Sequence, residues 1–74
     1  MTIKMYLTTG EILEGTTSNF ESMVRNAESV LNDSKEYKCE SIPSDEIQEA
    51  LEYLLEAKEG YMQICMEYNK VEVV

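Results

Sequence analysis

Apolar and polar residues alternate along the first part of the chain. Residues 3–7 place their apolar side chains on one face of an extended segment, which predicts a strand with one buried face. Residues 9–10 are Thr and Gly, a pair that allows a tight turn, and residues 11–14 then predict a second short strand that ends at Gly15. We therefore expect an N-terminal β-hairpin.

An apolar repeat at intervals of three and four residues predicts a helix over about residues 19–33. Ser18 and Glu21 have the spacing of a capping box, in which each side chain accepts a hydrogen bond from the other residue's backbone amide. Glu21 and Arg25 lie four residues apart, so we expect an ion pair on the helix surface.

A second helix is predicted from Ser44 to Gly60. Ser44 follows Pro43 and is a favoured helix cap, and the acidic residues after it suit the positive end of the helix dipole. Lys58 followed by Gly60 is a usual helix end. The expected apolar face consists of Ile47, Ala50, Leu51, Leu54 and Leu55.

The remaining segments predict strands. Residues 37–42 favour a short strand, and residues 61–68 alternate as a strand although they also fit a continued helix. We favour the strand, followed by a turn at Asn69–Lys70 and a last strand over residues 71–74. The chain is thus expected to form one α+β domain, residues 1–74, in the order ββαβαββ, with two helices packed on a small, mostly antiparallel sheet.

The C-terminal residues 71–74 have two further interpretations. Domains of this size often gain stability by oligomerising, so we expect a homodimer with this strand as one candidate seam. Alternatively, the same four residues are a peptide ligand that another protein captures at the edge of its sheet.

Composition and the first residues of the chain indicate the cellular compartment. The chain has 74 residues, of which 43% are hydrophobic, and it contains no apolar run of the roughly 20 residues needed to cross a bilayer. Its first residues include no apolar stretch long enough for a signal peptide, so we expect a cytoplasmic protein that does not bind membranes. In that compartment Cys39 and Cys65 are expected to be reduced, packed thiols.

The sequence lacks the residues that several kinds of catalytic and metal site require. There is no histidine, so one chain can build neither a Cys/His nucleophile nor a Cys/His zinc site. The polar residues 32–36 lack the Gly and the bidentate Glu of a calcium-binding loop, and the three glycines are isolated, so no phosphate-binding loop is present. We therefore expect a protein that is not an enzyme and uses no metal or cofactor.

The charge balance indicates the kind of partner. Fifteen Asp and Glu residues against six Lys and Arg residues give a formal net charge of -9. Six scattered cations make no basic face, and the acidic field repels both nucleic acid and anionic lipid. We therefore expect no direct binding of nucleic acid, and the natural partner is a basic surface on another protein.

Acidic residues recur along the second predicted helix at spacings of four, three, four and three residues. At 100° per residue they lie within an arc of about 80° and extend over about 21 Å. Glu46 and Tyr53 flank this arc, and Lys58 is the one basic residue between 45 and 59. The pattern is typical of a helix face that is merely solvated, and it also suits an acidic face that binds a protein. The five residues are Asp45, Glu49, Glu52, Glu56 and Glu59.

On a short chain with this charge and no catalytic motif, the stripe resembles the small acidic DNA-mimic proteins that bacteriophages make. Proteins of that class place carboxylates where DNA phosphates would lie, and they occupy the DNA-binding surface of a host nucleoid protein such as HU, a restriction enzyme or a CRISPR nuclease. The resemblance implies a competitive inhibitor that acts in the host cytoplasm during host takeover. It assigns partner binding to Asp45, Glu46, Glu49, Glu52, Glu56 and Glu59, with Glu21, Glu28 and Tyr53 as extensions of the surface.

A second hypothesis is a small non-enzymatic adaptor or regulatory protein. It would bind its partner through an apolar surface near the C-terminus, because Met and Tyr are adaptable contact residues. The same side chains are also typical of core or dimer packing. The residues concerned are Tyr61, Met62, Met66 and Tyr68.

Overall fold

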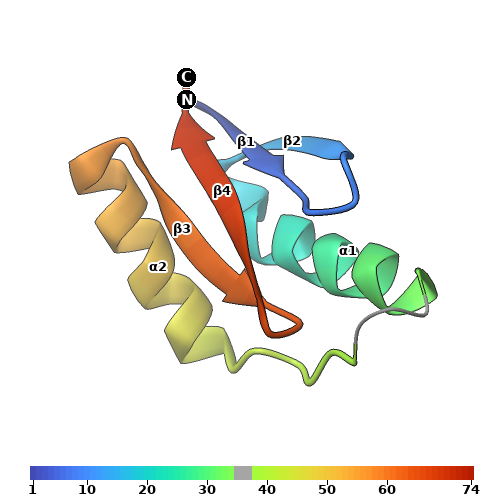
Figure 1. The fold of residues 1–74 in the computed structure, drawn as a ribbon. Helices are drawn as coiled ribbons and strands as arrows, with labels where there is room; N and C mark the ends of the chain where they lie inside the picture. The colour runs from blue at the N-terminus through green and yellow to red at the C-terminus, as the bar shows by residue number, and fades with distance from the viewer. Residues whose placement is uncertain (35–37) are drawn as a thin grey trace.

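The computed structural model describes residues 1–34 and 38–74 (Figure 1). It confirms the α+β class and the two predicted helices. No helix in these two ranges is both long and apolar enough to span a bilayer. The elements in order are β1 (Thr2–Tyr6), β2 (Ile12–Thr16), the 3-10 turn η1 (Thr17–Asn19), α1 (Phe20–Asp33), α2 (Ser44–Ala57), β3 (Glu59–Ile64) and β4 (Glu67–Val73).

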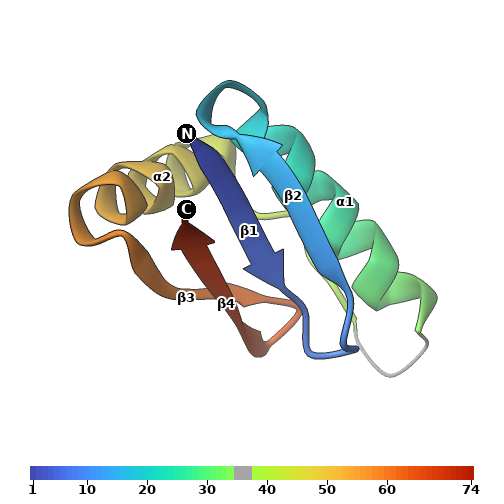
Figure 2. The same ribbon diagram turned by 90° about the horizontal axis from the view of Figure 1, so that it is seen from above.

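The four strands form one antiparallel sheet in the order β2-β1-β4-β3. The two hairpins therefore lie side by side, with the first and last strands of the chain in the middle. Ile3 pairs with Val73 and Met5 with Val71, so the two termini lie close together (Figures 1 and 2). Because β4 is paired on both sides, its edges are not available as a dimer seam. The interpretation of residues 71–74 as a free peptide ligand is also wrong.

Burial alternates along the strands, and both helices cover one face of the sheet (Figure 2). α1 packs against β2, and α2 packs against β3 and β4. The opposite face, which we call the open sheet face, carries the outward residues of all four strands. The largest fully buried side chains are Phe20, Ile3, Met5, Leu31, Ile64, Val24, Val71 and Asn69.

The start of α1 differs from the prediction. The capping box lies two residues earlier, at the start of η1, where the Asn19 side-chain oxygen accepts a hydrogen bond from the Thr16 backbone amide at 2.7 Å. The Ser18 hydroxyl contacts the Thr16 hydroxyl instead of capping the helix. Gly15 lies just before this turn, and a Cβ there would be 2.3 Å from Met23 Sδ, so β2 and α1 approach each other at a residue without a side chain.

The ends of α2 also differ from the prediction. The helix begins at Ser44 with Pro43 in the cap position, and it ends at Ala57, because Lys58 adopts a left-handed conformation with φ 70°. Gly60, the predicted stop, lies in β3 instead. A Cβ on Gly60 would be 3.1 Å from the ring of Tyr53, so the missing side chain leaves room for that ring.

The strand expected over residues 37–42 is absent from the part that the structure describes, residues 38–42, and residue 37 lies outside it. The segment instead crosses between α1 and the β3–β4 turn. Its backbone amides at Cys39 and Ile42 donate to the side chains of Asn32 (2.8 Å) and Glu28 (3.3 Å) on α1. The described order is therefore ββααββ.

The prediction of two reduced thiols is contradicted. Cys39 and Cys65 form a disulfide, with their Cα atoms 4.2 Å apart. The pairing became possible because the segment after α1 returns beside the β3–β4 turn, an approach that the spacing of 26 residues did not reveal.

Residues 61–68 form no continued helix, as we favoured, but they are not one strand either: β3 ends at Ile64, Cys65 and Met66 form a turn, and β4 begins at Glu67. Both turn residues have positive φ, 55° and 64°, as a two-residue hairpin turn of type I′ requires. Asn69, where the turn was expected, is fully buried in β4. Its side-chain nitrogen lies 3.5 Å from the Ile64 carbonyl oxygen and donates to it, and it also donates to the Glu67 carbonyl oxygen at 3.4 Å.

Candidate acidic interface

The core contacts of α2 determine which of its sides faces solvent. Ile47, Leu51 and Leu54 are buried against the sheet. With 100° of rotation per residue, the predicted acidic stripe lies on the opposite side of the helix. Its four helical members are all exposed and fall within an arc of about 60°. We call these residues, Asp45, Glu49, Glu52 and Glu56, the acidic face of α2.

The predicted fifth member, Glu59, does not belong to this face. α2 ends two residues before it, and Glu59 begins β3 opposite Glu72. Since Met62 and Ile64 point into the core, Glu59 faces the open sheet face instead. The acidic face therefore extends over about 17 Å rather than 21 Å, with a carboxylate about every 5.5 Å.

No cation neutralises the acidic face within the described residues: none of its four carboxylates takes part in an ion pair or a side-chain hydrogen bond there. Three cations pair with carboxylates elsewhere in the fold, and these pairs are Lys4–Glu14 (3.6 Å), Arg25–Glu28 (2.9 Å) and Lys70–Glu72 (3.8 Å). The negative charge of α2 is therefore left for solvent or for a partner.

The flanking residues lie on the side of α2 that faces β3. Glu46 is exposed, and it lines a hollow beside β3 that is described below. Tyr53 is 62% exposed, with its ring over Gly60. Both adjoin the acidic face, as the sequence predicted.

The two acids on α1 differ from each other. Glu21 is exposed and lies 3.9 Å from Arg25, so its predicted ion pair is confirmed and its charge is partly compensated. Glu28 is only 6% exposed, and it accepts hydrogen bonds from Arg25 and from the Ile42 backbone amide. It lies inside the fold and fastens the segment after α1, so it does not extend the exposed surface.

The residues of the adaptor hypothesis are divided. Met62 is buried in the core, whereas Tyr61, Met66 and Tyr68 are 71%, 81% and 66% exposed. Tyr61 and Tyr68 lie on the open sheet face, and Met66 lies in the turn.

The sequence did not reveal a row of side chains across the open sheet face. The strand register places Ile12 beside Tyr6, Tyr6 beside Lys70, and Lys70 beside Tyr61. The Lys70 ammonium lies 5.6 Å from the centre of the Tyr6 ring. Glu72 accepts a hydrogen bond from the Tyr6 hydroxyl, which raises the pKa of that phenol. These residues come from four separate strands, so only the register brings them together.

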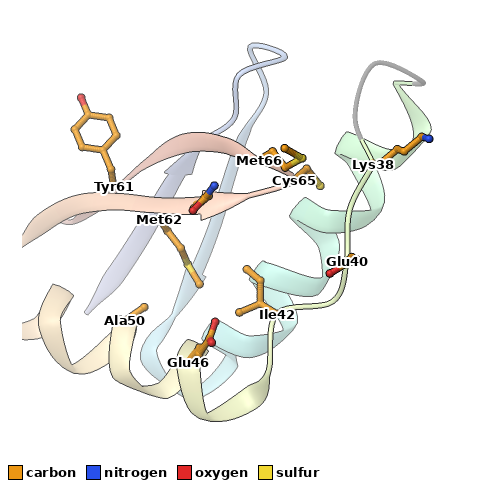
Figure 3. A pocket seen from close by; sticks show the side chains of 10 residues that line it. Lys38, Glu40, Ile42, Glu46, Ala50, Tyr61, Met62, Cys65 and Met66 are labelled. Carbon is orange, nitrogen blue, oxygen red and sulfur yellow. The ribbon is translucent and has the colours of Figure 1, made fainter.

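A hollow of about 690 Å³, which we call the β3 groove, lies between α2, the segment before it and β3 (Figure 3). Its lining includes Ile42, Glu46, Ala50, Tyr61 and Met62.

Within the described residues, no group of three or more acidic or sulfur side chains is arranged to hold a metal ion. Comparison of the chain with protein-family models, with curated protein sequences and with solved structures finds no match in any of the three.

Proposed function

We propose that this protein binds the basic, nucleic-acid-binding surface of a partner protein and thereby competes with DNA. The observation that carries the proposal is the acidic face of α2: four exposed carboxylates in line, with no cation to neutralise them among the described residues. Their spacing of about 5.5 Å is of the same order as the spacing of phosphates along one DNA strand, about 3.4 Å. A surface that binds phosphates therefore finds charges of the right sign at comparable intervals.

The rigid support of these charges favours binding. Three buried side chains, Ile47, Leu51 and Leu54, hold α2 against the sheet. Because the helix is already ordered, binding does not require the backbone that carries the carboxylates to order first. Like charges three and four residues apart destabilise the free helix by a few tenths of a kcal/mol per pair, and a basic partner relieves this repulsion.

The partner that suits this surface is a host DNA-binding protein, either a nucleoid protein such as HU or a defence nuclease. The protein is then an inhibitor of the kind that bacteriophages use. It needs no catalytic residue, because it acts by occupying the site that DNA would occupy. Interactions between exposed charges are screened by salt, so the complex should weaken steeply as ionic strength rises.

The first experiment compares two variants with the same net charge. Glu52→Lys with Glu56→Lys reverses half of the acidic face, whereas Glu11→Lys with Glu67→Lys changes two exposed acids near the hairpin turns. Each pair of substitutions raises the formal net charge of -9 by four units. The immobilised wild-type protein and both variants are incubated with bacterial lysate and eluted with a salt gradient. We expect the wild type and the Glu11/Glu67 variant to retain the same DNA-binding protein, and the Glu52/Glu56 variant to lose it.

The second experiment tests competition with DNA. The retained protein is purified and bound to a labelled DNA duplex, and the acidic protein is then added. Release of the duplex in proportion to the added protein supports the proposal. A ternary complex that keeps its DNA, or equal retention of the partner by both charge variants, contradicts it.

The exposure of Tyr61, Met66 and Tyr68 favours a second candidate function, an adaptor that binds through apolar contacts. Such a complex would persist at high salt and would weaken on Tyr68→Ser. Met62 is unsuitable for this test, because it is buried and its replacement would disturb the core. Retention of a partner that survives high salt and is lost on Tyr68→Ser would favour the adaptor over the DNA mimic.

A further inference from the structure

β3 is an edge strand with unpaired backbone groups. It ends the sheet order β2-β1-β4-β3, and its residues Glu59–Ile64 pair with β4 alone. The Val73 amide donates to the Lys58 carbonyl at 2.7 Å, which establishes which residues of β3 bond to β4. In an antiparallel pair the bonded positions recur at every second residue, so Gly60, Met62 and Ile64 bond to β4. The N–H and C=O groups of the alternate residues, Glu59, Tyr61 and Gln63, therefore point to the free edge.

The β3 groove runs beside this edge. Figure 3 shows Met62 pointing from β3 toward Ala50 on α2, with Ile42 on the segment before the helix. These three side chains form an apolar floor. No backbone hydrogen bond joins the described segment 38–43 to β3, so the edge faces the groove unpaired. The volume of about 690 Å³ is within the range of about 300–1,000 Å³ that ligand sites occupy.

Charge on the groove wall determines what can lie there. Glu40 and Glu46 are exposed on the wall opposite β3, and Lys38 is the one cation in the described lining (Figure 3). A second copy of the chain would bring its own Glu59 and the net charge of -9 to the same edge, where like charges repel. A basic segment meets no such repulsion.

We propose that the β3 groove binds an extended segment of a partner protein in which Lys or Arg alternates with apolar residues, and that the segment pairs with β3 as a fifth strand. Successive side chains of an added strand point to opposite faces. On the groove side, the aliphatic stem of a Lys or Arg covers Met62 and Ala50 while its charged end reaches Glu46 or Glu40. On the other side, an apolar residue lies beside Tyr61. The main chain of the segment bonds to Tyr61 and Gln63.

This inference uses β3 and its groove rather than the acidic face of α2, so it stands apart from the proposed function. Its test uses an eight-residue peptide with blocked ends in which Lys and Val alternate, together with a matched peptide of Glu and Val. The protein is labelled with nitrogen-15, and binding is followed through backbone amide resonances and amide hydrogen exchange. We expect the Lys/Val peptide to slow exchange at Tyr61 and Gln63 at least tenfold, and the Glu/Val peptide to have no effect.

Gln63→Pro is the sharpest variant. Proline removes the N–H that points to the free edge, and this N–H makes no bond to β4, so edge positions tolerate the substitution. We expect Gln63→Pro to weaken binding of the Lys/Val peptide at least tenfold and the matched control Gln63→Ala to weaken it less than threefold. Unchanged amide resonances in β1 show that the variant is folded. Glu46→Lys provides an independent test of the groove wall and should also weaken binding at least tenfold.

Three outcomes would overturn the inference. One is peptide binding that Gln63→Pro leaves unchanged in a folded protein. Another is binding that shifts resonances at Glu52 and Glu56 without protecting Tyr61 and Gln63, because that would be non-specific attraction to the acidic face. The third is a dimer of the free protein in sedimentation that Gln63→Pro converts to a monomer, since β3 would then pair with a second copy. Glu52→Lys with Glu56→Lys should retain peptide binding within threefold, whether or not the proposed function holds.

Discussion

The side-chain oxygen of Asn69 accepts a hydrogen bond from the backbone amide of Thr8 at 3.1 Å, across 61 residues of chain. The nitrogen of the same side chain donates to the carbonyl oxygens of Ile64 and Glu67, on either side of the β3–β4 turn. One buried amide thus joins the turn of the N-terminal hairpin to the turn of the C-terminal hairpin. It does so at the end of the sheet where β1 and β4 have ceased to pair.

Asn69→Ala should lower the free energy of unfolding by about 1–3 kcal/mol, because buried backbone groups lose a hydrogen-bond partner. The matched control is Asn26→Ala on the exposed side of α1, for which we expect a change within about 0.5 kcal/mol. Urea unfolding followed by circular dichroism measures both. Equal stability of the two variants would show that the Asn69 network does not hold the hairpins together.

Met66→Gly should stabilise the protein by about 0.5–1 kcal/mol. Met66 has φ 64°, a conformation that glycine adopts without steric cost, and its side chain is exposed, so little packing is lost. Met66→Ala keeps the Cβ and should leave the thermal midpoint nearly unchanged. A fall in the midpoint on Met66→Gly would mean that the Met66 side chain contributes more than its backbone costs.

The disulfide should contribute about 3 kcal/mol, because Cys39 and Cys65 are 26 residues apart and the link reduces the entropy of the unfolded chain. We expect Cys39→Ser with Cys65→Ser to unfold at lower urea concentration than the oxidised wild type. The wild type in reductant should match this double variant. Alkylation of both cysteines in the native, oxidised protein would contradict the pairing.

Tyr6 should give the fold a dependence on alkaline pH. The hydrogen bond to Glu72 is the main cause that raises the pKa of Tyr6 above 10.0, with desolvation and nearby carboxylate charge acting in the same direction. The folded state therefore favours the protonated phenol. Its contribution to stability is complete below the ordinary tyrosine pKa of about 10, and it is lost as pH rises through the raised value.

An absorbance titration of the tyrosines measures this effect. Tyr6→Phe should remove a step that lies above pH 10, and Glu72→Gln should move that step to lower pH. If the titration curve of Glu72→Gln were the same as that of the wild type, the hydrogen bond would not be the cause.

Glu52→Lys should raise the free energy of unfolding by about 0.5 kcal/mol while it weakens binding to the basic partner. Lys at position 52 lies three residues after Glu49 and four before Glu56, so two repulsive pairs become attractive. Glu11→Lys is the control that changes the charge but not the helix. If the Glu52 carboxylate contributes to partner binding and not to folding, Glu52→Lys should gain stability and lose binding. Loss of both would indicate a structural role for Glu52.

The sheet order shows why the end of the chain could not be assigned from local patterns. Residues 71–74 have the composition of a strand, but whether that strand lies at an edge or in the centre depends on pairing with β1, about seventy residues away. Asn69 has strong turn preference, and its burial depends on contacts from the other hairpin. Glu28 is a charged residue of the kind usually found at the surface. It is buried because the segment after α1 folds over it, and the periodicity of the helix gives no sign of that contact.

Local sequence patterns were enough to predict the two helices, the N-terminal hairpin, the α+β class and the run of acids along α2, because each depends on periodicity over a few neighbouring residues. The three-dimensional fold was needed to show that β4 is central, that Cys39 pairs with Cys65, and that Glu59 lies on the sheet rather than on the acidic face. It also shows that β3 has a free edge beside a groove. These features depend on contacts between segments distant in the chain, and no local pattern encodes which segments will meet.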